Sequence, residues 1–142
     1  MAFEVISTYL SFNTAGNTEI ADITQQVAET VRGMGIKDGQ VLVFVPGSTG
    51  AVTTIEYEPG VVKDLLEAIE ELAPVGKYYR HDDRWGDGNG YAHVRAALLG
   101  PSLTVPISGG HLILGTWQQI VFIDFDNRPR SRRILVQVSG EK

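Results

Sequence analysis

The fold is decided by residues 102–139, SLTVPISGGHLILGTWQQIVFIDFDNRPRSRRILVQVS. Their apolar residues are mostly β-branched or aromatic and fall into three runs, 102–107, 112–125 and 131–139. Ser-Gly-Gly separates the first two runs and Asp-Asn-Arg-Pro the last two, and both separators are typical of hairpin turns. We therefore expect three consecutive strands joined by hairpins.

Earlier segments alternate between strand-like and helix-like patterns. Short β-branched and aromatic runs predict strands, whereas Val27, Val31 and Met34 recur at helical spacing after a capping residue at Asp22 or Thr24. The expected segments are strands at residues 4–12, 18–21, 40–46 and 51–57, and helices at about 24–34, 59–73 and 91–99. With the C-terminal runs this makes about seven strands and three helices, which predicts an α+β fold.

The composition is that of one globular domain. The chain has 142 residues, of which 43% are hydrophobic and 20% charged, and no repeat or low-complexity tract interrupts it. One domain over residues 1–142 is therefore expected. Twelve Lys and Arg residues against 17 Asp and Glu residues leave a formal net charge of −5, which would repel a polyanion. We therefore expect no nucleic-acid partner.

Two absences from the sequence narrow the class of protein further. The longest wholly apolar run covers only residues 41–45, and residues 1–10 contain no basic segment leading into an apolar one. This predicts a cytoplasmic protein with no membrane partner. There are no cysteines, so disulfides, thiolate metal clusters and cysteine nucleophiles are excluded. Any metal must bind through His, Asp, Glu or backbone oxygen.

The three histidines stand where functional groups concentrate, in loops and at the ends of elements. His81 lies in a long loop, His93 begins the third expected helix, and His111 follows a Gly-Gly turn. Their spacing matches no compact metal motif. We expect the three imidazoles to converge. Together with Glu56 or Asp64 they would form either a zinc site or a cationic site for phosphate, and the sequence leaves both open.

The turn Gly47-Ser48-Thr49-Gly50 directly follows an expected buried strand. Its small residues leave backbone N–H groups free, and with two hydroxyls they can form an anion-binding nest. It is not a P-loop, because the Gly-Lys-Ser/Thr end of that motif is missing. A plain hairpin turn between two strands is the alternative.

Several acidic and aromatic residues are further candidates. Glu56 and Glu58 are two positions apart at the end of an expected strand and would face the same side if the strand continued, either as a carboxylate pair or as solvated residues. Asp64 lies among apolar helix residues, where a buried carboxylate needs a partner. Trp117 and Gln118 can line a site, although a Trp in a strand most often packs in the core.

Four arginines cluster around the last expected turn, namely Arg128, Arg130, Arg132 and Arg133. Guanidinium groups bind phosphate well, so the cluster is either a solvated hairpin or a phosphate-docking surface. Residues 74–90 show little periodicity and form a segment long enough to be functional. We expect this segment to close over a site.

Residues 102–120, SLTVPISGGHLILGTWQQI, resemble the signature of the YjbQ family (UPF0047), whose members are called secondary thiamine-phosphate synthases. The resemblance covers nearly the whole chain, through the runs DIT at 22–24, IEYE at 55–58, YRH at 79–81, NGYAH at 89–93 and LLGP at 98–101. It implies an α+β fold of two packed antiparallel sheets, assembled as a homotrimer.

The resemblance also implies a site and an activity. The implied polar site contains His81, His93, His111, Glu56 and Asp64 and lies near subunit contacts. The implied reaction joins a hydroxymethylpyrimidine diphosphate to a thiazole phosphate with loss of diphosphate, as a weak transferase activity. A non-catalytic trimer that binds a metal or a phosphate ligand is the alternative.

Cofactor and ligand contacts complete the expected site. A divalent metal, Zn or Mg, would bind through His81, His93 and His111. Many relatives carry Pro-His-Thr-Thr where this chain has Pro-Gly-Ser-Thr at residues 46–49, so one further imidazole is absent and an anion-binding role of the turn is favoured. A phosphorylated small molecule would contact Gly47, Ser48, Thr49, Asn89, Trp117 and Gln118.

Overall fold

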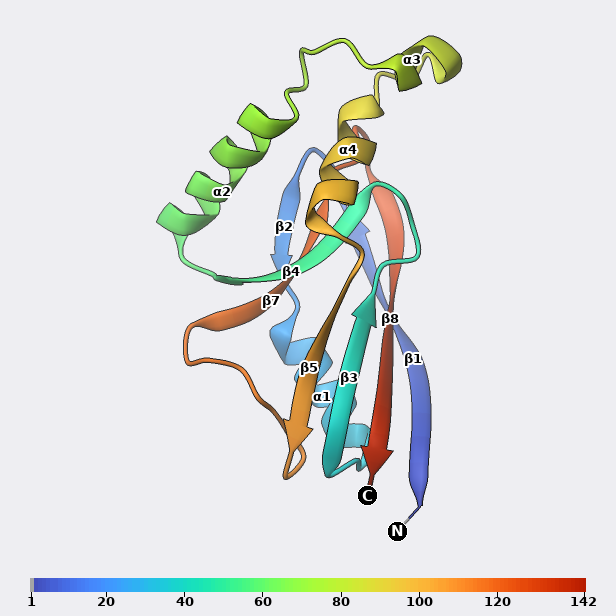
Figure 1. Ribbon diagram of the computed structural model, residues 1–142, viewed down its shortest axis with the longest axis vertical. Helices are drawn as coiled ribbons and strands as arrows, with labels where there is room; N and C mark the ends of the chain where they lie inside the picture. The colour runs from blue at the N-terminus through green and yellow to red at the C-terminus, as the bar shows by residue number, and fades with distance from the viewer. Residues whose placement is uncertain (1) are drawn as a thin grey trace.

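The computed structural model describes residues 2–142, which form eight strands and four helices (Figure 1). All paired strands are antiparallel, and they form two sheets. The five-stranded sheet has the order β1 (Phe3–Thr14), β8 (Arg130–Glu141), β3 (Asp38–Phe44), β5 (Ser102–Ser108) and β6 (His111–Leu112). The three-stranded sheet has the order β2 (Glu19–Asp22), β7 (Gln118–Asp124) and β4 (Gly50–Glu56). The expected α+β fold with two antiparallel sheets is confirmed.

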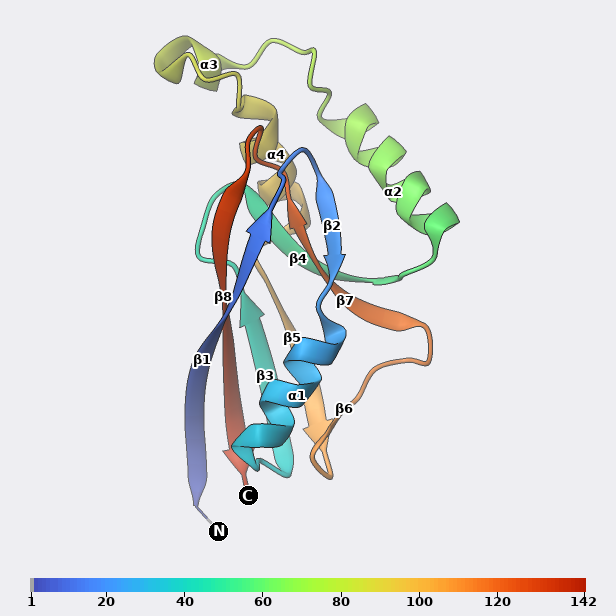
Figure 2. The ribbon, with the colours of Figure 1, turned by 180° about the vertical axis from the view of Figure 1, so that it is seen from behind.

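Helices flank both sheets. They are α1 (Thr24–Met34), α2 (Pro59–Leu72), α3 (Arg80–Trp85) and α4 (Gly90–Leu99). α1 packs against β6, β7 and β8, and it lies across the five-stranded sheet in Figure 2. α2 and α4 pack on β4, and α3 lies beyond the N-terminal end of α4. None of these helices is long and apolar enough to span a bilayer.

Strand β7 joins the two apolar cores of the molecule. Ile120 and Phe122 belong to the core between α1 and the five-stranded sheet. Val121 and Ile123 belong to the core under α2 and α4. Because successive side chains of a strand point to opposite faces, β7 is buried on both faces, which explains the unbroken apolar run at residues 120–123. The strand ends at Asp124, where the two sheets meet.

The expected hairpins form in only one place. β5 and β6 pair around Gly109 and Gly110, with Ser108 opposite His111. The expected strand 112–125 is divided, because β6 ends at Leu112 and β7 belongs to the other sheet. The connection between β7 and β8 therefore crosses between the sheets, and the prediction of a hairpin there is wrong. Strand propensity is a local property that carries no information about the pairing partner.

The turn at residues 47–50 also crosses between the sheets. β3 pairs with β5 and β8, whereas β4 pairs with β7, so this turn is not the hairpin that the sequence allowed. The expected loop at residues 74–90 contains the short helix α3. Six residues are too few to produce a recognisable helical periodicity.

Candidate functional site

His81 and His93 lie together where α3 folds back onto α4. Their ring centroids are 4.3 Å apart. The chain reverses direction between the two helices at Gly86, whose φ of 65° is in the left-handed region that glycine adopts without steric cost. The backbone N–H of Gly90 donates to Asp82 Oδ1 at 2.9 Å, which ties the start of α4 to α3. The structure therefore brings two of the three predicted histidines together.

Two carboxylates adjoin this histidine pair. His81 Nδ1 lies 3.4 Å from Asp82 Oδ1 and 3.6 Å from Asp87 Oδ1. One ligand atom from each of these three residues lies within 4.8 Å of the others. One imidazole and two carboxylates form a donor set that suits Zn²⁺, whereas Mg²⁺ prefers oxygen ligands. We refer to His81, Asp82 and Asp87 as the His81 cluster.

The environment of His93 favours its neutral form. Burial lowers the pKa of His93, and the neighbouring His81 lowers it further, because a second positive charge would be repelled. The carboxylates of Asp87, Asp126 and Asp82 oppose this shift, but they do not reverse it. His93 is therefore neutral at pH 7 and can accept a hydrogen bond or ligate a metal.

His93 faces a cavity of about 350 Å³, which we call the His93 cavity. Its wall is formed by the turn after β3 on one side and by α4 on the other. This volume is at the lower end of the range typical of small-molecule sites. The predicted ligand residues Gly47 and Ser48 therefore do lie beside His93. The lining residues are Gly47, Ser48, Gly50, His93, Ala96, Ala97 and Pro101.

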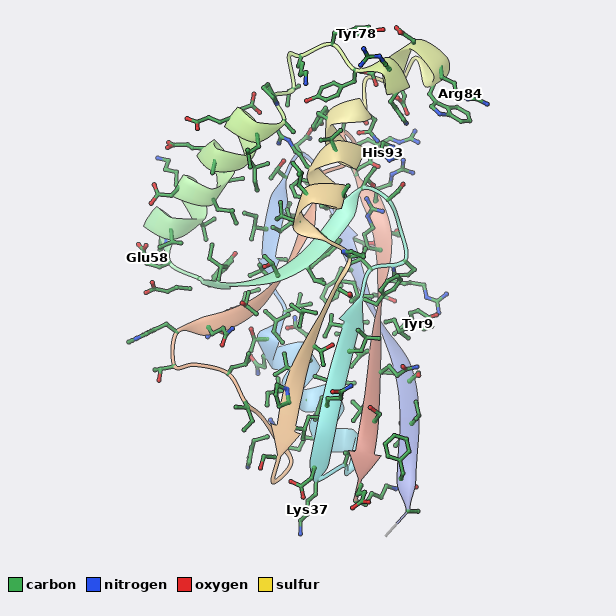
Figure 3. The ribbon with its side chains drawn as sticks, in the orientation of Figure 1. Tyr9, Lys37, Glu58, Tyr78, Arg84 and His93 are labelled. Carbon is green, nitrogen blue, oxygen red and sulfur yellow. The ribbon has the colours of Figure 1, made fainter. Side chains whose placement is uncertain are left out.

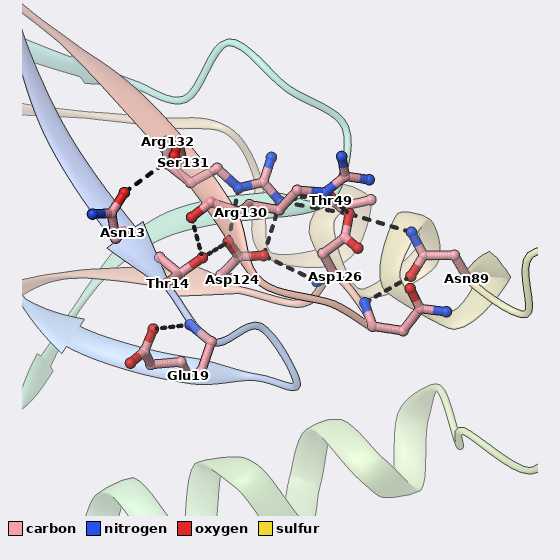
Figure 4. A network of polar contacts seen from close by, with 12 residues as sticks. Asn13, Thr14, Glu19, Thr49, Asn89, Asp124, Asp126, Arg130, Ser131 and Arg132 are labelled. Carbon is pink, nitrogen blue, oxygen red and sulfur yellow. Dashed lines mark hydrogen bonds and ion pairs between the residues drawn. The ribbon is translucent and has the colours of Figure 1, made fainter.

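A buried polar cluster lies behind this cavity, at the junction of the sheets (Figure 4). Arg132 of β8 donates through Nε and Nη2 to the Asp124 carboxylate of β7, at 2.7 and 2.8 Å. Arg132 Nη2 also donates to Thr49 Oγ1 at 2.7 Å, and Thr49 Oγ1 donates to Asp126 Oδ2 at 3.1 Å. Asn89 Nδ2 donates to the same Asp126 oxygen at 3.4 Å. Thr49 and Asn89, both predicted to contact ligand, are thus bonded within the protein and position the turn and α4.

The carboxylates of this cluster are ionised. Burial raises the pKa of Asp124, but hydrogen bonds from Arg132 and Thr14 outweigh burial and hold it below its ordinary value. Burial acts on Asp126 in the same way, and the hydrogen bond from Thr49 and the charge of Arg130 outweigh it. Neither carboxylate was predicted from the sequence, because Asp124 ends an apolar strand, Asp126 follows in the connection to β8, and nothing local marks either as buried.

Other predicted site residues lie elsewhere on the chain. Glu56 and Trp117 line a separate hollow of about 270 Å³ at the start of α2. Gln118 donates to Thr54 Oγ1 at 3.1 Å on the three-stranded sheet. Asp64 is exposed on α2, so it needs no buried partner.

Glu58 does not form a carboxylate pair with Glu56. It is the N-cap of α2, and its carboxylate accepts hydrogen bonds from the backbone N–H groups of Gly60 and Val61 at 2.8 and 2.9 Å. These two bonds lower the pKa of Glu58. The strand ends at Glu56, so the same-face argument does not extend to the next acidic residue.

His111 lies at the opposite end of the five-stranded sheet from His93. Pro101 lines the His93 cavity, and β5 then runs six residue steps to Ser108, opposite His111, which is about 20 Å. The Gly110 N–H donates to the carbonyl of Lys37, and Figure 3 shows Lys37 far from His93. The predicted convergence of three histidines is therefore wrong within one chain, because the β5–β6 hairpin carries the third one away.

Comparisons with known proteins agree with this fold over most of the chain. The family model described as UPF0047 protein YjbQ-like matches residues 8–141. The chain is 47% identical to a UPF0047 protein of Archaeoglobus fulgidus, over 90% of this chain and 97% of that protein. It is 36% identical to the UPF0047 protein YugU of Bacillus subtilis, over 92% of this chain and 97% of that protein.

Solved structures of similar proteins share the architecture. A YbjQ-like protein of unknown function from Sulfolobus solfataricus matches with a TM-score of 0.93 at 35% identity, covering 99% of this chain and 100% of that one. An uncharacterised protein from Clostridium acetobutylicum matches with a TM-score of 0.84 at 36% identity, covering 92% of this chain and 98% of that one. The names of these relatives state a family and no activity.

Proposed function

The chain belongs to the YjbQ family (UPF0047), and we propose that it joins a hydroxymethylpyrimidine diphosphate to a thiazole phosphate in the His93 cavity. The observation that carries the proposal is that a neutral imidazole and an open glycine-serine turn share one cavity. Such a cavity can hold an organic ring and a phosphate group side by side.

The reaction places clear demands on the protein. The thiazole ring nitrogen attacks the methylene carbon of the pyrimidine, the bond from that carbon to oxygen breaks, and diphosphate leaves with the electron pair. The protein must hold the two reactants in line, exclude water from the activated carbon and offset the charge of the leaving group.

Groups suited to these tasks surround the cavity. Among residues 2–142, the backbone N–H group of the exposed residue Ser48, which lines the cavity, makes no hydrogen bond, so it is free to donate to a phosphate oxygen. His93, as a neutral acceptor, would orient a substrate ring. The His81 cluster would hold a divalent ion, whose charge would help to neutralise the leaving diphosphate.

A coupled assay with both substrates and magnesium tests the proposal. We expect His93→Ala to lower turnover by about 10²-fold or more, the scale for losing one preorganised contact. Val94→Ala, at the neighbouring half-exposed position of α4, is the matched control and should leave turnover unchanged. Equal product from wild type, His93→Ala and a blank without enzyme would reject this reaction.

A non-catalytic metal-binding function is the second candidate, because the three donors of the His81 cluster lie close together. Zinc uptake would then require a neutral imidazole and would weaken below about pH 6.5. Zinc titration of wild type and His81→Ala, followed by calorimetry, separates the two candidates. Uptake that depends on His81 in a protein with no turnover would favour binding alone.

A homotrimer is part of the same proposal. His111 and Glu56 lie away from the His93 cavity, so they can contribute to it only from a neighbouring chain. Large apolar side chains also remain exposed, including Trp117 at 71% and Leu72 at 67%. Covering such side chains at contacts between copies would be favourable.

A further inference from the structure

A second hollow lies on the other side of the turn after β3. It has a volume of about 380 Å³, and two of the four clustered arginines line it. We call it the arginine hollow. Pro46 borders it and the adjacent Gly47 borders the His93 cavity, so the turn separates the two. Its lining residues are Tyr9, Val45, Pro46, Ser131, Arg132 and Arg133.

Arg132 presents an unused donor at this boundary. Its Nε and Nη2 bind Asp124 and Thr49, so the guanidinium is held rigidly. Within residues 2–142, Nη1 makes no hydrogen bond. The atom is not buried, so it is open to solvent. A Cβ atom at Gly47 would lie 3.4 Å from Nη1. The absence of a side chain at Gly47 therefore keeps this donor open.

The local charge at the hollow is positive, although the whole chain carries a formal charge of −5. The two buried carboxylates, Asp124 and Asp126, are balanced by ion pairs with Arg132 and Arg130. Arg133 forms no ion pair among the described residues, so its charge is in excess. Its guanidinium carbon lies 3.9 Å from the centroid of the Tyr9 ring, a stacking contact that limits its freedom.

We propose that the arginine hollow binds the phosphate or diphosphate end of the substrate through Arg132 Nη1 and Arg133, and that Gly47 keeps Arg132 accessible for this contact. Planar guanidinium groups match the oxygens of a phosphate, and a group already held by ion pairs loses little freedom on binding. The inference deepens the proposed function, on which the identity of the ligand rests. The organic part of the ligand would extend past Gly47 into the His93 cavity.

Calorimetric titration with inorganic diphosphate, in buffer free of divalent metal, tests this subsite. Gly47→Leu covers Arg132 Nη1 without removing the guanidinium from its buried ion pairs, and Arg133→Ala removes the exposed charge. Each should raise the dissociation constant about tenfold or more, as expected for losing one charge-assisted contact. The controls are Gly33→Leu on α1, where a side chain would meet open space, and Arg32→Ala on the same helix, which removes the same charge as Arg133→Ala but outside the lining of the hollow.

The outcomes separate this inference from the proposed reaction. Equal dissociation constants for the two variants and their controls would overturn the subsite, and so would the absence of diphosphate binding by wild type at millimolar concentration. If diphosphate binding depends on Gly47 and Arg133 while the coupled assay shows no product, the subsite is supported and the proposed reaction is rejected. If product forms while diphosphate binding depends on neither Gly47 nor Arg133, the proposed reaction is supported and the subsite is rejected.

Discussion

His93 combines burial, a histidine neighbour and a position on the wall of a cavity. Burial and the ring of His81 disfavour the protonated form more than the nearby carboxylates favour it. Since its pKa in the folded state is below 6.5, the unfolded chain takes up the proton first. The stability that the neutral residue contributes is therefore complete above pH 6.5 and is lost as the pH falls through the lower pKa of the folded state.

We predict that the imidazole of His93 titrates below pH 6.5 and that His81→Asn raises this midpoint towards 6.5, since it removes the repelling charge but leaves the burial. Proton NMR of the imidazole signals measures the midpoint directly. His111→Asn is the control, because His111 lies about 20 Å away at the far end of β5. A midpoint that His81→Asn leaves unchanged would contradict the assignment.

Among the elements, β7 of one sheet is tied to β8 and β1 of the other by the buried polar cluster. Asp124 lies on β7 and is fully buried, and it binds Arg132 on β8 and Thr14 at the end of β1. No pairing of backbone groups joins β7 to these two strands. The side-chain contacts of Asp124 therefore hold the two sheets in register at the end nearest the candidate site.

We predict that Asp124→Ala lowers the free energy of unfolding by about 3–5 kcal/mol, because it takes the acceptor from buried Thr14 and from the mostly buried side of the Arg132 guanidinium. Urea denaturation at pH 7 measures the change. Asp64→Ala, which removes an exposed carboxylate of α2, should change the free energy by no more than about 0.5 kcal/mol. A similar small change for both variants would show that the cluster does not hold the sheets together.

The same cluster gives the stability a pH dependence with a defined sign. The pKa values of Asp124 and Asp126 are below their ordinary value of 3.8 in the folded state. The stabilisation that the two ionised carboxylates contribute is therefore present above pH 3.8. It is lost as the pH falls through their lower pKa values in the folded state. In Asp124→Ala this acid-induced loss should be shallower than in wild type.

For the whole molecule, the proposed trimer is the property with the simplest measurement. Light scattering after gel filtration should give three times the 15.5 kDa mass of one chain. Exposed sheet edges and large exposed apolar side chains are the physical reason, since association can cover both. A mass of one chain at micromolar concentration would refute the trimer, and with it the completion of the His93 cavity by residues of another copy.

The candidate site was predictable only in part. His93, Gly47 and Ser48 were identified because a histidine at a helix start and a small-residue turn are recognisable locally, and they do share a cavity. Asp87 lies in the segment 74–90, whose sequence shows little periodicity, and its place beside His81 depends on how α3 folds back onto α4. The separation of His111 from His81 and His93 depends on the length and direction of β5.

Local patterns were enough to predict most of the strands and helices, because side-chain period, β-branching and turn residues act within a few positions of the chain. The run at residues 102–120 was likewise enough to indicate the family. The crossings between the two sheets at residues 47–50 and 126–129 became visible only in the folded chain. Strand pairing and the meeting of Asp124 with Arg132 depend on contacts between distant parts of the chain, whose energies no local pattern records.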